Sequence, residues 1–157
     1  MTPTKIKAFI ETYCKDYIGT YELEGKSTVT FPAVTIGEPP NGLTVKGNEV
    51  IIGKFPRISK NQRTGNYTYR CEYHTVEVFL HDYEDDEGWE NFYTLVDELL
   101  ATFPRASGRD IPQSKHFESL PGYQVIIKVE SFREVNDTKQ SQLAFGGGKH
   151  VNSVSVY

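Results

Sequence analysis

The sequence is poor in cysteine and in long apolar stretches, and both shortages restrict what this protein can be. Cys14 and Cys71 are the only cysteines in 157 residues. Two cysteines make no disulfide framework, so we expect a reducing compartment. No apolar run approaches the roughly 20 residues that span a bilayer, which predicts no membrane association. Residues 1–17 are too polar for a signal peptide, so we expect synthesis and folding in a cytoplasm unless the protein is exported by another route.

The excess of one sign of charge over the other is small as well. The 17 Lys and Arg residues against 21 Asp and Glu residues give a formal net charge of −4, unlike that of a general nucleic-acid binder. Apolar residues make up 38% of the chain and aromatic residues 13%, nearly all Tyr and Phe. Tyrosine suits strands and also amphipathic contact surfaces, so this composition fits both a plain sheet protein and a partner-binding one.

Motifs of catalysis and cofactor binding are missing. Gly146–Lys149 lacks the glycine spacing, the following Ser or Thr and the helix of a phosphate-binding loop. His74 and His81 would point to opposite faces of a regular strand, which disfavours a zinc site. Cys71 stands among alternating tyrosines, as a buried inert cysteine does. We therefore expect no enzymatic activity, no metal and no cofactor.

Hydrophobic periodicity predicts two helices. The apolar face of the first covers residues 6–17, and Thr2 can cap this helix, Pro3 suits its first position and Gly19 suits its end. The second covers residues 87–103 and is stopped by Pro104. Their apolar stripes comprise Ile6, Phe9, Ile10, Tyr13 and Tyr17 in the first helix and Trp89, Phe92, Val96, Leu99, Leu100 and Phe103 in the second.

Strand-like segments fill much of the remaining chain. They cover residues 28–31 and 33–36 on either side of Pro32, 43–45 and 50–52 as a short hairpin, 67–81 and 124–132. Residues 55–67 and 105–121 are expected to be a polar loop and a polar connection. The apolar face of the long strand changes near His74, which predicts a bulge or a strand that continues into another subunit. The fold class is therefore α+β, a mainly antiparallel sheet with two helices packed on one face.

The C-terminal residues differ in character from the rest. We expect an α+β assembly domain over residues 1–136 and a flexible C-terminal arm over residues 137–157. Gly146–Gly148 provides a hinge. The apolar residues around and beyond it are too few to fold alone but sufficient to add a strand to an exposed edge of a neighbour. Alternatively, the segment is a disordered terminus without a role or folds back on its own domain. We expect subunit contacts from Phe145, Val151, Val154, Val156 and Tyr157.

Two segments of opposite charge are further candidates for contacts between subunits. The stretch from Lys54 to Arg70 contains five basic residues and no acid, and residues 82–87 are mostly acidic. Both can be solvated loops, and acids at a helix start are favoured by the helix dipole. Alternatively, the acidic stretch binds a cation or the basic one faces DNA phosphates. If subunits meet head to tail, the contacts join Arg57, Lys60 and Arg63 to Asp85, Asp86 and Glu87.

The order of elements resembles that of tail-terminator and head–tail joining proteins of long-tailed bacteriophages. The matching region is Tyr69–Phe132: the strand Tyr69–Leu80, a loop, the helix Trp89–Phe103, a polar connection and the strand Gln124–Glu130. The helix over residues 6–17 also fits. The likeness lies in element order and size and includes no diagnostic motif, and the glycine-rich segment after Asn136 departs from it.

This resemblance implies a structural virion protein. It implies a homo-oligomeric ring, commonly a hexamer, that terminates the tail tube and joins it to the neck. Its partners would be tail tube and neck proteins, with DNA passing through the lumen without specific binding. The location would be the tail or neck of the virion, after assembly in the host cytoplasm. Alternatives are another neck, tube or baseplate subunit, a small metal-dependent hydrolase that uses residues 82–87 and His81, and a peptide- or nucleic-acid-binding module that uses residues 54–70.

Overall fold

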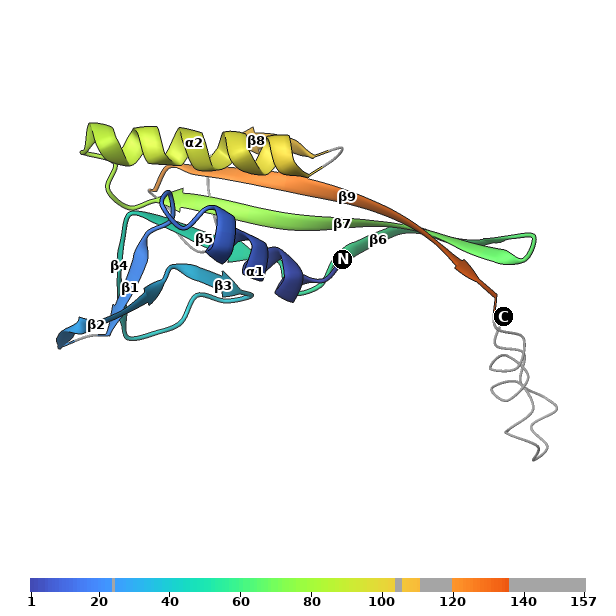
Figure 1. The fold of residues 1–157 in the computed structure, drawn as a ribbon, viewed down its shortest axis with the longest axis horizontal. Coiled ribbons are helices and arrows are strands. Elements are labelled where there is room, and N and C mark those ends of the chain that lie inside the picture. Colours follow the sequence, from blue (N-terminus) through green and yellow to red (C-terminus); the bar gives the residue numbers. More distant parts are fainter. Residues whose placement is uncertain (24, 104–105, 111–119, 136–157) are drawn as a thin grey trace, which may run out of the picture. The chain divides into compact units, whose positions relative to one another are not determined.

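The structure of the chain is a computed structural model (Figure 1). It describes residues 1–135 apart from 24, 104–105 and 111–119. The chain divides into two compact units. The first contains residues 1–59 and 72–129, and the second contains residues 60–71 and 130–157. The expected arm, residues 137–157, lies outside the described residues.

Helix α1 spans Pro3–Tyr13 and begins as the sequence predicts. The side chain of Thr2 accepts a hydrogen bond from Lys5 N at 3.2 Å, and Pro3 needs no acceptor in the first turn. The helix ends at Tyr13, before the expected Tyr17, with Cys14 as its C-cap, and in the turn that follows the N–H of Tyr17 donates to the carbonyl of Cys14 at 2.9 Å. Gly19 therefore does not end the helix. Gly19 instead allows its backbone to pass close to that of Lys46, since a Cβ there would lie 1.8 Å from the Lys46 carbonyl oxygen.

Helix α2 spans Asp86–Thr102, one residue earlier at each end than predicted. Its apolar stripe is buried at Phe92, Val96 and Leu99, as expected, and also at Leu95. No helix in the described part of the chain is long and apolar enough to cross a membrane.

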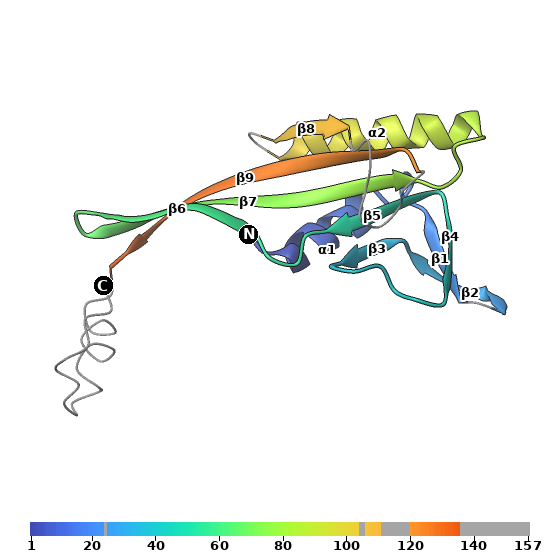
Figure 2. The same ribbon diagram turned by 180° about the vertical axis from the view of Figure 1, so that it is seen from behind.

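The strands form two sheets (Figures 1 and 2). The larger has the order β3-β5-β7-β9-β8, with β6 also paired to β7. Its strands are β3 Val34–Ile36, β5 Asn48–Ile52, β6 Arg57–Thr64, β7 Tyr67–Leu80, β8 Ser107–Asp110 and β9 Gly122–Glu134. β3 and β5 are parallel, whereas the β5–β7 and β8–β9 pairs are antiparallel. The smaller sheet, β2-β1-β4, is antiparallel and contains β1 Thr20–Leu23, β2 Lys26–Pro32 and β4 Leu43–Lys46.

Both helices pack on one face of the larger sheet and form one core with it. The buried residues of this core include Ile6 and Ile10 from α1, Leu95 and Leu99 from α2, and Val50, Ile52, Val76, Val78, Leu80, Val125 and Ile127 from the sheet. Successive strand residues point to opposite faces, so Glu49, Ile51 and Phe79 point away from the helices. These three are also buried, and Tyr21 of the smaller sheet contacts Glu49. The predicted α+β class with two helices on one face is confirmed.

Two predictions about strands are wrong. Residues 43–45 and 50–52 do not form a hairpin, because β4 pairs with β1 while β5 pairs with β3 and β7. Gly47, at φ +79°, turns the chain from one sheet to the other. The expected loop at residues 55–67 contains β6, whose eight residues are all exposed. Only backbone pairing with β7 makes it a strand. Two further strands, β1 and β8, were not predicted.

The apolar face of β7 changes between Cys71 and His74, which are buried at odd-numbered and even-numbered positions. Pairing between β5 and β7 is regular from Val76 to Leu80, and the even-numbered residues of this stretch face the core. His74 continues the same side and is 1% exposed. A polar residue therefore occupies a core-facing position at the point where the apolar alternation of the sequence changes face.

Candidate functional site

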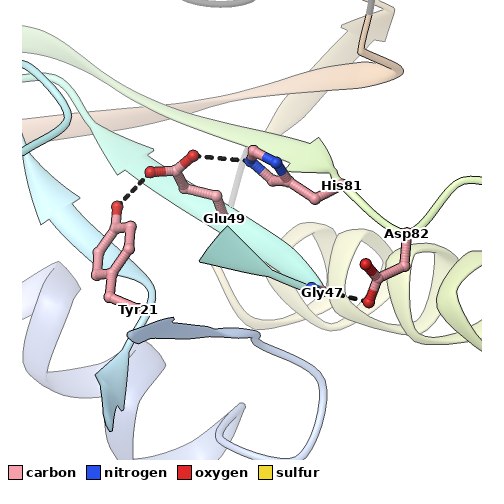
Figure 3. Close-up of polar contacts among 5 residues, drawn as sticks. All are labelled: Tyr21, Gly47, Glu49, His81 and Asp82. Atoms are coloured by element: carbon pink, nitrogen blue, oxygen red, sulfur yellow. Dashed lines mark hydrogen bonds and ion pairs between the residues drawn. The ribbon is translucent and has the colours of Figure 1, made fainter. Parts of the chain in front are cut away.

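A buried polar cluster lies between the two sheets of the first unit (Figure 3). Glu49, 1% exposed, accepts a short hydrogen bond from the hydroxyl of Tyr21 on one carboxylate oxygen. Its other oxygen lies 2.9 Å from Nε2 of His81. Burial, followed by the contact with Glu49, raises the pKa of Tyr21 well above its usual range. Both carboxylate oxygens are thus engaged, and the cluster joins β1, β5 and the residue that follows β7.

A second set of bonds fixes the turn beside this cluster. The Oδ2 atom of Asp82 accepts a hydrogen bond from Gly47 N at 2.9 Å (Figure 3). The N–H of His81 donates to the Gly47 carbonyl at 3.0 Å. A Cβ at Gly47 would lie 2.9 Å from the Cα of Gly19. Asp82 and His81 therefore hold in place the turn that leads the chain from β4 into β5.

The acidic stretch serves the start of α2. Asp85 is the N-cap and accepts a hydrogen bond from Glu87 N at 3.2 Å, while Asp86 and Glu87 occupy the first turn. An open hollow of about 490 Å³ is lined by residues 81–85. Within the described ranges, no three His, Cys, Asp or Glu side chains gather as metal ligands would. The geometry fits the expected interaction of these acids with the helix dipole.

The basic residues lie on and beside β6 and are exposed. Alternation along the strand places Arg57 and Arg63 on one face and Lys60 on the other. The guanidinium of Arg57 stacks 4.7 Å from the ring centre of Tyr73, a cation–π contact. The Nε of Arg63 donates to the carbonyl of Gly65 at 3.0 Å. The basic stretch is thus distributed over two faces of a strand, which differs from the expected loop.

The described part of the second unit is a ribbon of strands with little core. It contains residues 60–71 and 130–135, of which only Cys71 is buried. The hydroxyl of Tyr69 donates to Oε1 of Glu130 at 2.8 Å, and this bond raises the pKa of Tyr69 to about 12. The rings of Tyr69 and Phe132 lie 5.1 Å apart, yet Phe132 is 69% exposed and Tyr67 is 53% exposed.

Apolar surface is also present in the first unit, at places the sequence did not single out. An open groove of about 440 Å³ lies between the exposed side of α2 and the start of β9, with Trp89, Tyr93 and Tyr123 in its walls. The three-stranded sheet leaves Leu23, Val29 and Phe31 between 40% and 45% exposed. The alternation of Val29 and Phe31 was the only sequence signal for the latter surface.

Two residues considered for chemistry are buried. Among the described residues, neither ring nitrogen of His74 has a hydrogen-bond partner. Burial lowers the pKa of His74 against the opposing effect of Glu72, whose carboxylate is 3.9 Å away. Cys71 is 2% exposed and forms no disulfide, so the predicted burial of this cysteine is confirmed. Phe145, Val151, Val154, Val156 and Tyr157, the expected arm contacts, lie outside the described residues.

Comparisons of the chain with models of protein families, with curated proteins and with solved structures found no match.

Proposed function

We propose that this chain is a structural subunit that assembles head to tail into a ring, and that the ring terminates a bacteriophage tail tube and joins it to the neck. The observation that carries the assembly role is the ribbon formed by residues 60–71 and 130–135. Only one of these residues is buried, whereas Phe132 and Tyr67 are largely exposed. Strands without an apolar face to bury are marginally stable, so covering by a neighbour would stabilise them.

The chemistry of the ribbon suits such a contact. Tyr, Phe and Arg are enriched at protein interfaces, because their large side chains combine apolar area with polar groups. The ribbon carries exposed Arg63 and Lys60, while the opposite charge gathers at residues 82–87 of the other unit. A contact between two different surfaces repeats from copy to copy and closes into a ring when the rotation permits.

The polar groups that most resemble catalytic machinery serve structural contacts. Both carboxylate oxygens of Glu49 are engaged, one by Tyr21 and the other by His81. Asp82 and Asp85 accept hydrogen bonds from backbone N–H groups. This favours assembly over the alternative of a small metal-dependent hydrolase. The tail-terminator assignment itself comes from the resemblance in element order, and a neck, tube or baseplate subunit is its nearest alternative.

The assembly role is tested by replacing Phe132 with Ser and measuring the mass of the particles by light scattering across protein concentrations. We expect Phe132→Ser to raise the concentration needed for assembly at least about tenfold, equivalent to ~1.4 kcal/mol. Tyr13→Ser is the matched control, since Tyr13 is 72% exposed at the end of α1. Equal effects of the two substitutions would contradict a specific role for the ribbon.

A charge reversal tests the electrostatic part of the proposal. Replacing Arg57, Lys60 and Arg63 together by Glu should slow assembly and invert its dependence on salt, because like charges would then face each other at the rim of the interface and salt would screen their repulsion. Circular dichroism should remain unchanged, since all three side chains are exposed. Assembly that is indifferent to both the reversal and the salt concentration would show that these residues are merely solvated.

A further inference from the structure

Strand β2 forms an open edge of the three-stranded sheet (Figure 2). Its inner side pairs with β1 at Lys26 and over residues 30–32, with a shift of register between these two places, and among the described residues no strand pairs with its outer side. Val29 and Phe31 of β2 are 45% and 42% exposed, and Leu23 of the neighbouring β1 is 40% exposed. The edge is therefore bordered by apolar side chains that are only partly covered.

The hydrogen-bond pattern shows which backbone groups point outward. Ala33 N donates to the Gly19 carbonyl at 3.0 Å, and Tyr21 is opposite Phe31 in the register. Hydrogen-bonded and non-hydrogen-bonded pairs alternate in antiparallel sheets, so Tyr21 and Phe31 exchange hydrogen bonds and Thr30 does not bond to β1. The N–H and C=O of Thr30 therefore point to the open side, ready to pair with a further strand.

Other edges of the described chain are less suited to accept a strand. β3 has three residues, and β4 and β8 have four each, whereas β2 has seven. β6 is longer but carries Arg57, Lys60 and Arg63, and charged side chains discourage edge pairing. The sequence of β2, KSTVTFP, contains one charged residue, Lys26. Length and low charge together favour β2 as the receiving edge.

We propose that residues 151–157 of one subunit add a strand to the outer edge of β2 in a neighbouring subunit. This inference rests on the proposed ring assembly and names the surface that receives the arm. Residues 151–157, VNSVSVY, contain no charged side chain and alternate Val154 and Val156 with Ser153 and Ser155.

This alternation matches the receiving strand. Valines beside Val29 and Phe31 would cover the apolar face, while serines would lie beside Thr30 on the other. Residues 136–150, which connect the described chain to this segment, can extend over roughly 50 Å and so can reach another copy.

Disulfide trapping between two differently tagged full-length copies tests the proposal. One copy carries Thr30→Cys, whose position is exposed on the edge strand, and the other carries Ser155→Cys. We expect mild oxidation of the mixture to give the mixed covalent dimer at least about fivefold more than a mixture in which Tyr13→Cys replaces Thr30→Cys. The native cysteines, Cys14 and Cys71, are buried and should not compete.

A third variant separates strand addition from chance collision. Adding Val154→Asp to the Ser155→Cys copy should abolish the enrichment, because a charge would then lie against Val29 and Phe31. Particle mass is recorded on the same samples. Ring-sized particles without enrichment would overturn this inference alone. Absence of any assembly would overturn the proposed function and this inference with it.

Discussion

The buried carboxylate of Glu49 allows the stability of the fold to be tested quantitatively. Tyr21→Phe removes a single hydroxyl that donates to this carboxylate, and both side chains are at most 2% exposed. A hydrogen bond to a charged group contributes about 1.5–3 kcal/mol, and a neutral pair about 0.5–1.5 kcal/mol. Tyr21→Phe should therefore lower the free energy of unfolding by about 1.5–3 kcal/mol in the native background and by about half as much after Glu49→Gln.

The measurement is a double-mutant cycle by urea denaturation of the wild type, the two single variants and the double variant. All four are compared at one protein concentration, since assembly changes apparent stability. A coupling of at least about 1 kcal/mol between Tyr21 and Glu49 is expected. If Tyr21→Phe costs the same in both backgrounds, the carboxylate is not charged or the hydrogen bond contributes nothing, and the description of the cluster is wrong.

Three further predictions follow from burial and from the arm. Leu99→Ala should cost about 2–5 kcal/mol of unfolding free energy, because Leu99 is fully buried, and an unchanged thermal melt would contradict its placement. The lowered pKa of His74 means that the unfolded state binds a proton that the folded state excludes, so stability should fall as pH drops below about 6.5. In urea titrations from pH 7.5 to 5.5, His74→Leu should lose part of this dependence, and an identical dependence would refute the assignment. Truncation after Asn136 should weaken assembly without changing the fold, whereas particles of unchanged mass and stability would exclude a role for the arm.

The helices were predictable because their signals are local. Helix α1 begins at Pro3 behind the Thr2 cap, and α2 buries Phe92, Val96 and Leu99 at helical spacing. These patterns need no knowledge of distant residues.

Strand partners were not predictable in the same way. β4 and β5 are separated only by Gly47, yet they pair in different sheets, and the choice depends on β1 and β7 elsewhere in the chain. β6 has no alternating apolar pattern at all. Its pairing with β7 comes from backbone groups, which every sequence carries.

The polar cluster was missed for a related reason. Glu49 stands directly before the apolar run Val50–Ile52, where an exposed turn is the ordinary expectation. Its partners, Tyr21 and His81, are 28 and 32 residues away in the chain. No spacing rule joins three such positions, because their meeting requires both sheets to be in place. The acidic stretch, by contrast, was recognisable at Asp85–Glu87 from its position at the start of a helix.

The central claim is that this chain assembles into a closed ring. Electron micrographs of the purified full-length protein, together with its mass in solution at increasing concentration, test this most directly. We predict annular particles of one size, with a mass near six times the 17.8 kDa of the chain. A monomer at every protein and salt concentration, with no annular particles in the micrographs, would contradict the account.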